Sequence, residues 1–256
     1  MGGFKTRQIE YTIFEVFGLM WSNEISLDKK YEREIEFILG KLNKMKDVSF
    51  AVEESKDRTW IYLASVCERQ DSVEEEITEI VETVILTFMK VRFFCEKLNT
   101  MPMTHSKCVL ICSLVHFDKD FERTIVRKVL SNALDYNLDG LMNFRLRALK
   151  DEWQELASVS SRLLDGAGSD DDVYDVSTFI TGSDARRCKI VINGENIKNI
   201  TEHKTIEVLD VFDDDDFNLI NSIVENRPEE IIIENFKLPK SLIAPLKKIA
   251  KVVESN

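Results

Sequence analysis

The chain has 256 residues, of which 44% are hydrophobic and 9% aromatic, so it carries enough apolar material for a core, and disorder over most of its length is excluded. Nine glycines and four prolines are few for this length, which favours long helices over loops. The net charge of −12 counts against nucleic-acid and membrane-surface partners, because an acidic surface repels phosphate groups and anionic lipid.

The first seventy residues predict a helix among short strands. Residues 8–17 alternate apolar and polar side chains and indicate a strand. Apolar residues at spacings of three and four indicate a helix over residues 28–46. Two segments rich in strand formers, 48–52 and 59–67, are joined by a short polar turn and predict an antiparallel hairpin.

Helical patterns dominate the centre of the chain. A long amphipathic helix is expected to begin at Asp71, which with Glu74 resembles a capping box. Residues 104–166 are predicted to be wholly helical, with a break at the Asp139-Gly140 pair. Residues 104–117 are the exception, because their apolar run is also compatible with a buried strand.

A glycine-rich and then acidic stretch, residues 165–172, predicts a linker. Beyond it, Asn193-Gly194 supplies the two residues that a type I′ turn requires. The segments on either side, 188–192 and 195–200, are therefore expected to form a hairpin.

The last fifty residues predict two helices and two strands. Residues 205–212 are a candidate strand, and the helix that follows ends at Arg227-Pro228. Residues 231–233 form a short buried strand, expected to pair in parallel with an earlier one because a helix connects them. A final helix starts near Pro239, and its apolar stripe is expected to extend to Val253.

Together these elements predict a helix-rich α+β fold with mainly antiparallel strands. We expect an N-terminal α+β unit over residues 1–100, a central helical segment over 101–166, and a C-terminal α/β unit over 167–256.

One stripe of metal-ligating residues stands out. His105, Cys108, Cys112 and His116 follow one another at spacings of three and four, and thiolate and imidazole are ligands that zinc prefers. On a helix the two histidines would be roughly 16 Å apart, so a single zinc ion could take only neighbouring residues. Cys108, Cys112 and His116 are therefore candidate ligands, and buried packing of the cysteines is the simpler alternative.

Other chemical motifs are absent from the sequence. Three histidines leave little room for nucleophilic catalysis, and neither a Gly-x-Ser-x-Gly elbow nor a phosphate-binding loop occurs. The acidic runs 170–172 and 213–216 lack the spacing of a calcium loop, so they are expected to cap helices.

Charged and aromatic residues between 121 and 153 allow three interpretations. They form an exposed face with ordinary ion pairs, a buried arginine–glutamate pair that locks one helix onto another, or an arginine pair that binds phosphate or carboxylate. Clustering of Phe121, Phe144 and Trp153 would favour the lock. The candidate residues are Glu122, Arg123, Arg145 and Trp153.

At these residues the chain resembles the YtxC-like family, bacterial proteins labelled as sporulation proteins without an established activity. The resemblance runs through residues 121–123, 138–140, 144–146 and 153–156, and again at 216–223 and 228–233. It implies a cytoplasmic protein of spore-forming bacteria and carries over no catalytic residues.

The sequence therefore favours a non-catalytic interaction or regulatory protein linked to sporulation. The alternative is a metal-binding enzyme or sensor that uses zinc at the 105–116 stripe. We expect an unknown protein partner and neither nucleic acid nor membrane, although Arg145, Arg147 and Lys150 could form a local basic patch. No signal peptide and no apolar run of about 20 residues are apparent, so the expected location is the cytoplasm.

Overall fold

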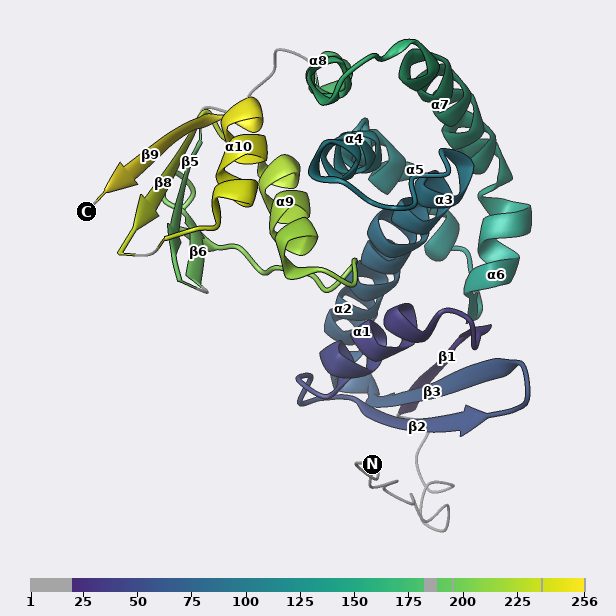
Figure 1. The fold of residues 1–256 in the computed structure, drawn as a ribbon. Helices are drawn as coiled ribbons and strands as arrows, with labels where there is room; N and C mark the ends of the chain where they lie inside the picture. Colours follow the sequence, from purple (N-terminus) through teal and green to yellow (C-terminus); the bar gives the residue numbers. More distant parts are fainter. Residues whose placement is uncertain (1–19, 182–187, 195, 236, 256) are drawn as a thin grey trace. The chain divides into compact units, whose positions relative to one another are not determined.

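The computed structural model describes residues 20–181, 188–194, 196–235 and 237–255 (Figure 1). The predicted strand at 8–17 lies outside these residues. The contacts divide the chain into two compact units. Unit 1 comprises the described residues up to 89 together with 120–151, and unit 2 comprises 90–119 together with the described residues from 152 onward.

Unit 1 contains a sheet in the order β2-β3-β1-β4. The hairpin of β2 (Ser49–Glu54) and β3 (Arg58–Val66) confirms the prediction. β1 (Met20–Asp28), which the sequence analysis missed, pairs antiparallel with β3 along its whole length. The two-residue β4 (Tyr136–Asn137) joins β1 in parallel and connects distant parts of the chain.

Helices α1 and α2 lie on the same face of this sheet (Figure 1), because their apolar stripes face the inward side chains of β3. The predicted capping box is wrong: α2 begins at Gln70, and its N-cap, Arg69, makes no side-chain cap. Glu74 instead accepts a hydrogen bond from Trp21 Nε1 at 2.5 Å. The helical segments of unit 1 are α1 (Glu32–Leu42), η2 (Cys67–Arg69), α2 (Gln70–Thr83), η3 (Val84–Met89), α5 (Lys119–Leu130, from residue 120), α6 (Leu138–Gly140) and η4 (Leu141–Arg145).

Unit 2 is built around α4, in which every residue from 108 to 116 is buried. The segment 104–117, for which both a helix and a buried strand were possible, therefore contains a helix. Thr104 caps this helix by accepting a hydrogen bond from the Lys107 amide. α4 packs against α3, α8 and α9. The helices of unit 2 are α3 (Lys90–Lys97), α4 (His105–His116), α7 (Arg147–Gly166, from residue 152), α8 (Asp170–Thr181), α9 (Asp215–Asn226) and α10 (Lys240–Ile249).

The sheet of unit 2 has the order β7-β6-β5-β8-β9, and α9 and α10 lie on one of its faces (Figure 1). The predicted hairpin and the predicted parallel pairing are both present, as β5–β6 and β5–β8. The strands are β5 (Lys189–Asn193), β6 (Asn196–Asn199), β7 (Lys204–Thr205), β8 (Glu230–Glu234) and β9 (Lys251–Ser255).

Three local predictions in unit 2 were wrong. Asn193 pairs with Asn196 and belongs to the strand instead of the turn, and Gly194 follows it at a φ of 60° that suits glycine. The expected strand at 205–212 is reduced to the end of β7. The last helix stops at Ile249, and Val253 belongs to β9, which pairs in parallel with β8.

The expected linker is mostly helical. α7 continues to Gly166 and α8 begins at Asp170, so only three residues separate the two helices. The acidic runs do cap helices, as expected. Asp172 accepts from the Gly168 amide at 2.8 Å, and Asp214 accepts from two amides at the start of α9.

The fold is helix-rich α+β, as expected, with two small mixed sheets. Most strand pairs are antiparallel, and the parallel pairs are β1–β4, β5–β8 and β8–β9. The two units do not follow the three consecutive segments expected from the sequence. Residues 101–166 contribute α4 to unit 2 and α5 to unit 1, because each helix packs within a different unit.

Candidate functional site

The predicted metal ligands lie on the most buried helix of unit 2. Cys108 and Cys112 are completely buried, with their Sγ atoms 3.8 Å apart. His116 is also buried, and its Nε2 atom lies 3.0 Å from Oδ1 of Asn221 on α9. The stripe therefore faces other helices, as packing residues do.

Burial also disfavours the thiolate form of Cys112, which is the form that zinc binds. It raises the pKa of the Cys112 thiol well above its ordinary value and lowers the pKa of His116 to about 3. At neutral pH the thiol is protonated and the imidazole is uncharged. In the part of the chain that the structure describes, no group of three or more His, Cys, Asp or Glu residues could hold a metal ion, so Cys108, Cys112 and His116 do not come together as a zinc site.

A buried carboxylate joins two helices of unit 1. Glu82 on α2 is 4% exposed and accepts hydrogen bonds from Nε of Arg123 at 2.5 Å and from Nε of Arg127 at 2.7 Å, both on α5. Arg127 also donates to Glu75 at 2.7 Å. Arg123 was among the residues predicted for a lock, whereas Glu82 and Arg127 were not. This arrangement is an arginine–glutamate lock between helices.

The other residues proposed for the lock lie elsewhere. Glu122 is on the buried face of α5, and Arg145 donates to the carbonyl oxygen of Asn132 at 3.1 Å. Trp153 belongs to unit 2, where its ring lies 5.7 Å from that of Phe93. The side chains of Phe121 and Phe144 are 60% and 82% exposed, so neither is buried in the aromatic cluster that would have favoured a lock at these residues.

A completely buried lysine was missed. Lys90 donates to the carbonyl oxygen of Val115 at 2.9 Å and to that of Phe117 at 3.3 Å, at the end of α4. Its ammonium group also lies 5.5 Å from the ring centre of Trp153. A cation at this position stabilises the carbonyl groups at a helix C-terminus. Its signal in the sequence is a single lysine within an apolar run.

Unit 1 carries two apolar side chains that are almost fully exposed. Leu134 is 94% exposed and Phe144 is 82% exposed. The hydrogen bond from Arg145 to Asn132 ties the neighbouring backbone segments together. We refer to Leu134, Phe144 and Arg145 as the 134/144 surface.

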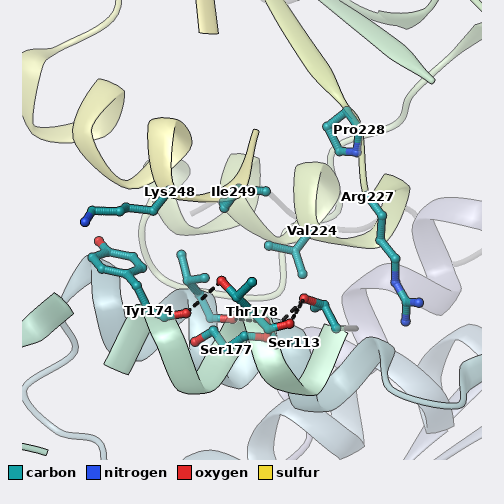
Figure 2. Close-up of a pocket in the computed structure, with 11 residues that line it drawn as sticks. Ser113, Tyr174, Ser177, Thr178, Val224, Arg227, Pro228, Lys248 and Ile249 are labelled. Carbon is teal, nitrogen blue, oxygen red and sulfur yellow. Dashed lines mark hydrogen bonds between the residues drawn. The ribbon is translucent and has the colours of Figure 1, made fainter. Parts of the chain in front are cut away.

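A pocket of about 180 Å³ lies in unit 2 between α4, α8 and the C-terminal ends of α9 and α10. Figure 2 shows hydroxyl groups of α4 and α8 on one side and Val224 and Ile249 on the other. The remaining polar groups are Tyr174, Arg227 and Lys248. The hydroxyl residues that line it are Ser113, Ser177, Thr178 and Thr181.

The two cations of the pocket already have partners. Arg227 donates to the carbonyl oxygen of His116 at 2.8 Å, and Lys248 pairs with Asp171 at 2.8 Å. Burial raises the pKa of Tyr174 to about 12, so its hydroxyl stays protonated. The pocket therefore offers mainly hydroxyl oxygens and apolar surface.

A comparison of the chain with protein-family models, curated proteins and solved structures finds no match. The resemblance to the YtxC-like family and its link with sporulation therefore stay predictions. Among the described residues, no helix is both long enough and apolar enough to cross a membrane.

Proposed function

We propose that this protein is a non-catalytic interaction protein that binds an acidic, amphipathic segment of a protein partner through the 134/144 surface. The observation that carries this proposal is the exposure of Leu134 and Phe144, each within two residues of the bond from Arg145 to Asn132. Arginine and large aromatic side chains are enriched among the residues that contribute most to binding energy in protein interfaces.

The local backbone supports the proposal. Phe144 lies in η4, a π-helical turn closed by the hydrogen bond from the Leu146 amide to the Leu141 carbonyl at 2.8 Å. Such turns cost stability relative to an α-helix and occur frequently at functional sites. Here the turn belongs to a segment that carries an exposed ring instead of burying it.

Charge indicates the kind of partner. Arg145, Arg147 and Lys150 all come within the six residues that follow Phe144, in a chain whose net charge is −12. Arg147 lies 4.0 Å from Asp151 in an exposed pair, which contributes little and is easily exchanged for a partner's carboxylate. A segment with acidic and apolar faces would match both the cations and the exposed ring.

The test begins with photo-crosslinking in cells that produce the protein with p-benzoylphenylalanine in place of Phe144. Phe179 on α8 is the matched control position, because it is also 82% exposed. The protein that crosslinks only from position 144 is then purified and its binding is measured by calorimetry. We expect Phe144→Ser combined with Leu134→Ser to weaken binding at least tenfold, and Phe179→Ser to change it less than twofold.

Two results would overturn the proposal. One is crosslinking to the same proteins from positions 144 and 179, which indicates general stickiness. The other is crosslinking of position 144 to nucleic acid, which would assign the basic residues to phosphate binding instead.

A further inference from the structure

The pocket of unit 2 has hydroxyl groups with an unusual common feature. Ser113, Ser177, Thr178 and Thr181 each donate to a carbonyl oxygen of their own helix, at distances of 2.8 to 3.1 Å. A hydroxyl group has one hydrogen and two lone pairs, so each of these oxygens still accepts hydrogen bonds. The polar side of the pocket is therefore rich in acceptors and calls for a ligand with several donors.

The charges around the pocket disfavour a charged ligand of either sign. Lys248 is paired with Asp171 and also lies near Asp175, so its charge is already offset and offers little attraction to an anion. At the other end of the pocket, the guanidinium of Arg227 donates a hydrogen bond to the His116 carbonyl group and would repel a cationic ligand. A neutral ligand avoids both penalties.

The opposite wall is apolar and suits carbon-bound hydrogens. Val224 and Ile249 line it, and Figure 2 shows both facing the hydroxyl side. The volume of about 180 Å³ equals that of roughly six water molecules at about 30 Å³ each, so the pocket suits a small molecule.

From this geometry we infer that the pocket between α4, α8, α9 and α10 binds a small neutral polyol. Hydroxyl groups of the ligand donate to the oxygens of Ser113, Ser177 and Thr178, and its carbon chain packs against the apolar wall. The site is independent of the 134/144 surface, because it lies wholly within unit 2.

A series of three five-carbon compounds tests both the site and the charge argument. Ribitol is the neutral polyol, ribonate its anionic analogue and ribitylamine its cationic analogue. Each is titrated into the ¹⁵N-labelled full-length protein, and the amide shifts of α4 and α8 are followed by NMR. We expect saturable shifts with ribitol at millimolar concentration, and binding of both charged analogues to be at least fivefold weaker.

A pair of variants separates specific binding from the general effect of polyols on proteins. Thr178→Val removes one acceptor from an exposed position in the pocket and should weaken ribitol binding at least fivefold. Thr83→Val is the control, because Thr83 in unit 1 makes the same bond to its own helix, to Glu79 at 2.8 Å. It should change ribitol binding less than twofold.

Three outcomes would overturn the inference. Shifts that do not saturate would show that ribitol acts only as a cosolvent. Equal binding by Thr178→Val and the original chain would place ribitol elsewhere. Tighter binding of ribonate or ribitylamine would assign the pocket to a charged ligand.

Discussion

At the scale of single residues, Glu82 is the clearest case of a polar group that fixes tertiary structure. Its carboxylate is buried, yet both of its oxygens accept hydrogen bonds from arginines of α5. Removing one partner of such an arrangement leaves the other charges without compensation. The cost is reduced here because the side chains of Arg123 and Arg127 are 44% and 37% exposed and regain water.

We therefore expect Glu82→Gln to lower the free energy of unfolding by about 2 kcal/mol, measured by urea denaturation. Glu79→Gln is the control, because Glu79 is exposed and lies 3.7 Å from Arg127, and it should change stability by less than about 0.5 kcal/mol. Equal effects of the two variants would show that Glu82 does not lock the helices.

His116 predicts a dependence of stability on pH. Burial lowers its pKa in the folded state to about 3, below the value of about 6.5 expected when unfolded. Between these values the unfolded chain binds more protons, so stability is fully present above pH 6.5 and is lost as the pH falls. From pH 6.5 to pH 4.5 this histidine should contribute a loss of roughly 2–3 kcal/mol.

The measurement is the free energy of unfolding between pH 4.5 and pH 7.5, compared with that of His116→Gln. The free energy of unfolding of His116→Gln should depend less on pH over this range, whatever its value at neutral pH. His203→Gln replaces an exposed histidine and should keep the original slope. An unchanged slope in His116→Gln would mean that other groups cause the pH dependence.

At the scale of elements, the sequence predicted strand pairings between neighbouring segments but not those between distant segments. The β2–β3 and β5–β6 hairpins join neighbouring segments, so alternation and a short turn were sufficient. β1 has a mixed composition, and its membership of the sheet depends on β3, with Met20 opposite Val66. β9 was assigned to a helix, because its two valines continue the stripe of α10.

The candidate sites show the same limit. Arg123 was identified from its own segment, but its partner Glu82 lies 41 residues earlier in the chain and only the fold joins them. Lys90 resembles any lysine that interrupts an apolar run. The pocket is formed by four helices that meet only in three dimensions, so no spacing in the sequence indicated it.

Lys90 also gives a prediction for the packing of α3 against α4. Lys90→Met leaves two carbonyl groups near the end of α4 without their charged donor, and we expect a loss of about 2 kcal/mol. The fluorescence of Trp153 reports the transition when Trp21 and Trp60 are replaced by phenylalanine. Lys97→Met on the same helix is the control. The exposed ammonium of Lys97 lies 5.6 Å from the centre of the Phe93 ring, and loss of this contact should lower the free energy of unfolding by less than about 1 kcal/mol.

At the scale of the whole molecule, neither unit is a continuous piece of chain. Unit 1 is interrupted by residues 90–119, and unit 2 by 120–151. A fragment of residues 1–100 therefore lacks α5, and a fragment of 167–256 lacks α4, against which α8 and α9 pack. The domains suggested by sequence composition are not the units that bury the core.

We expect neither fragment to unfold cooperatively in urea, while the full chain does, as followed by circular dichroism. A fragment of residues 20–166 is a useful comparison, because it retains every described element of unit 1. A cooperative transition in the 1–100 fragment would show instead that this segment folds without α5.

The burial of α4 on all sides also affects the synthesis of the protein. Its apolar residues leave the ribosome long before α9, which ends 110 residues later (226 − 116). At about 5–20 residues per second, this delay lasts roughly 5 to 20 s. During that interval an apolar helix has no native partner among the later helices. The period between the translation of α4 and that of α9 is therefore when the nascent chain most needs protection by a chaperone.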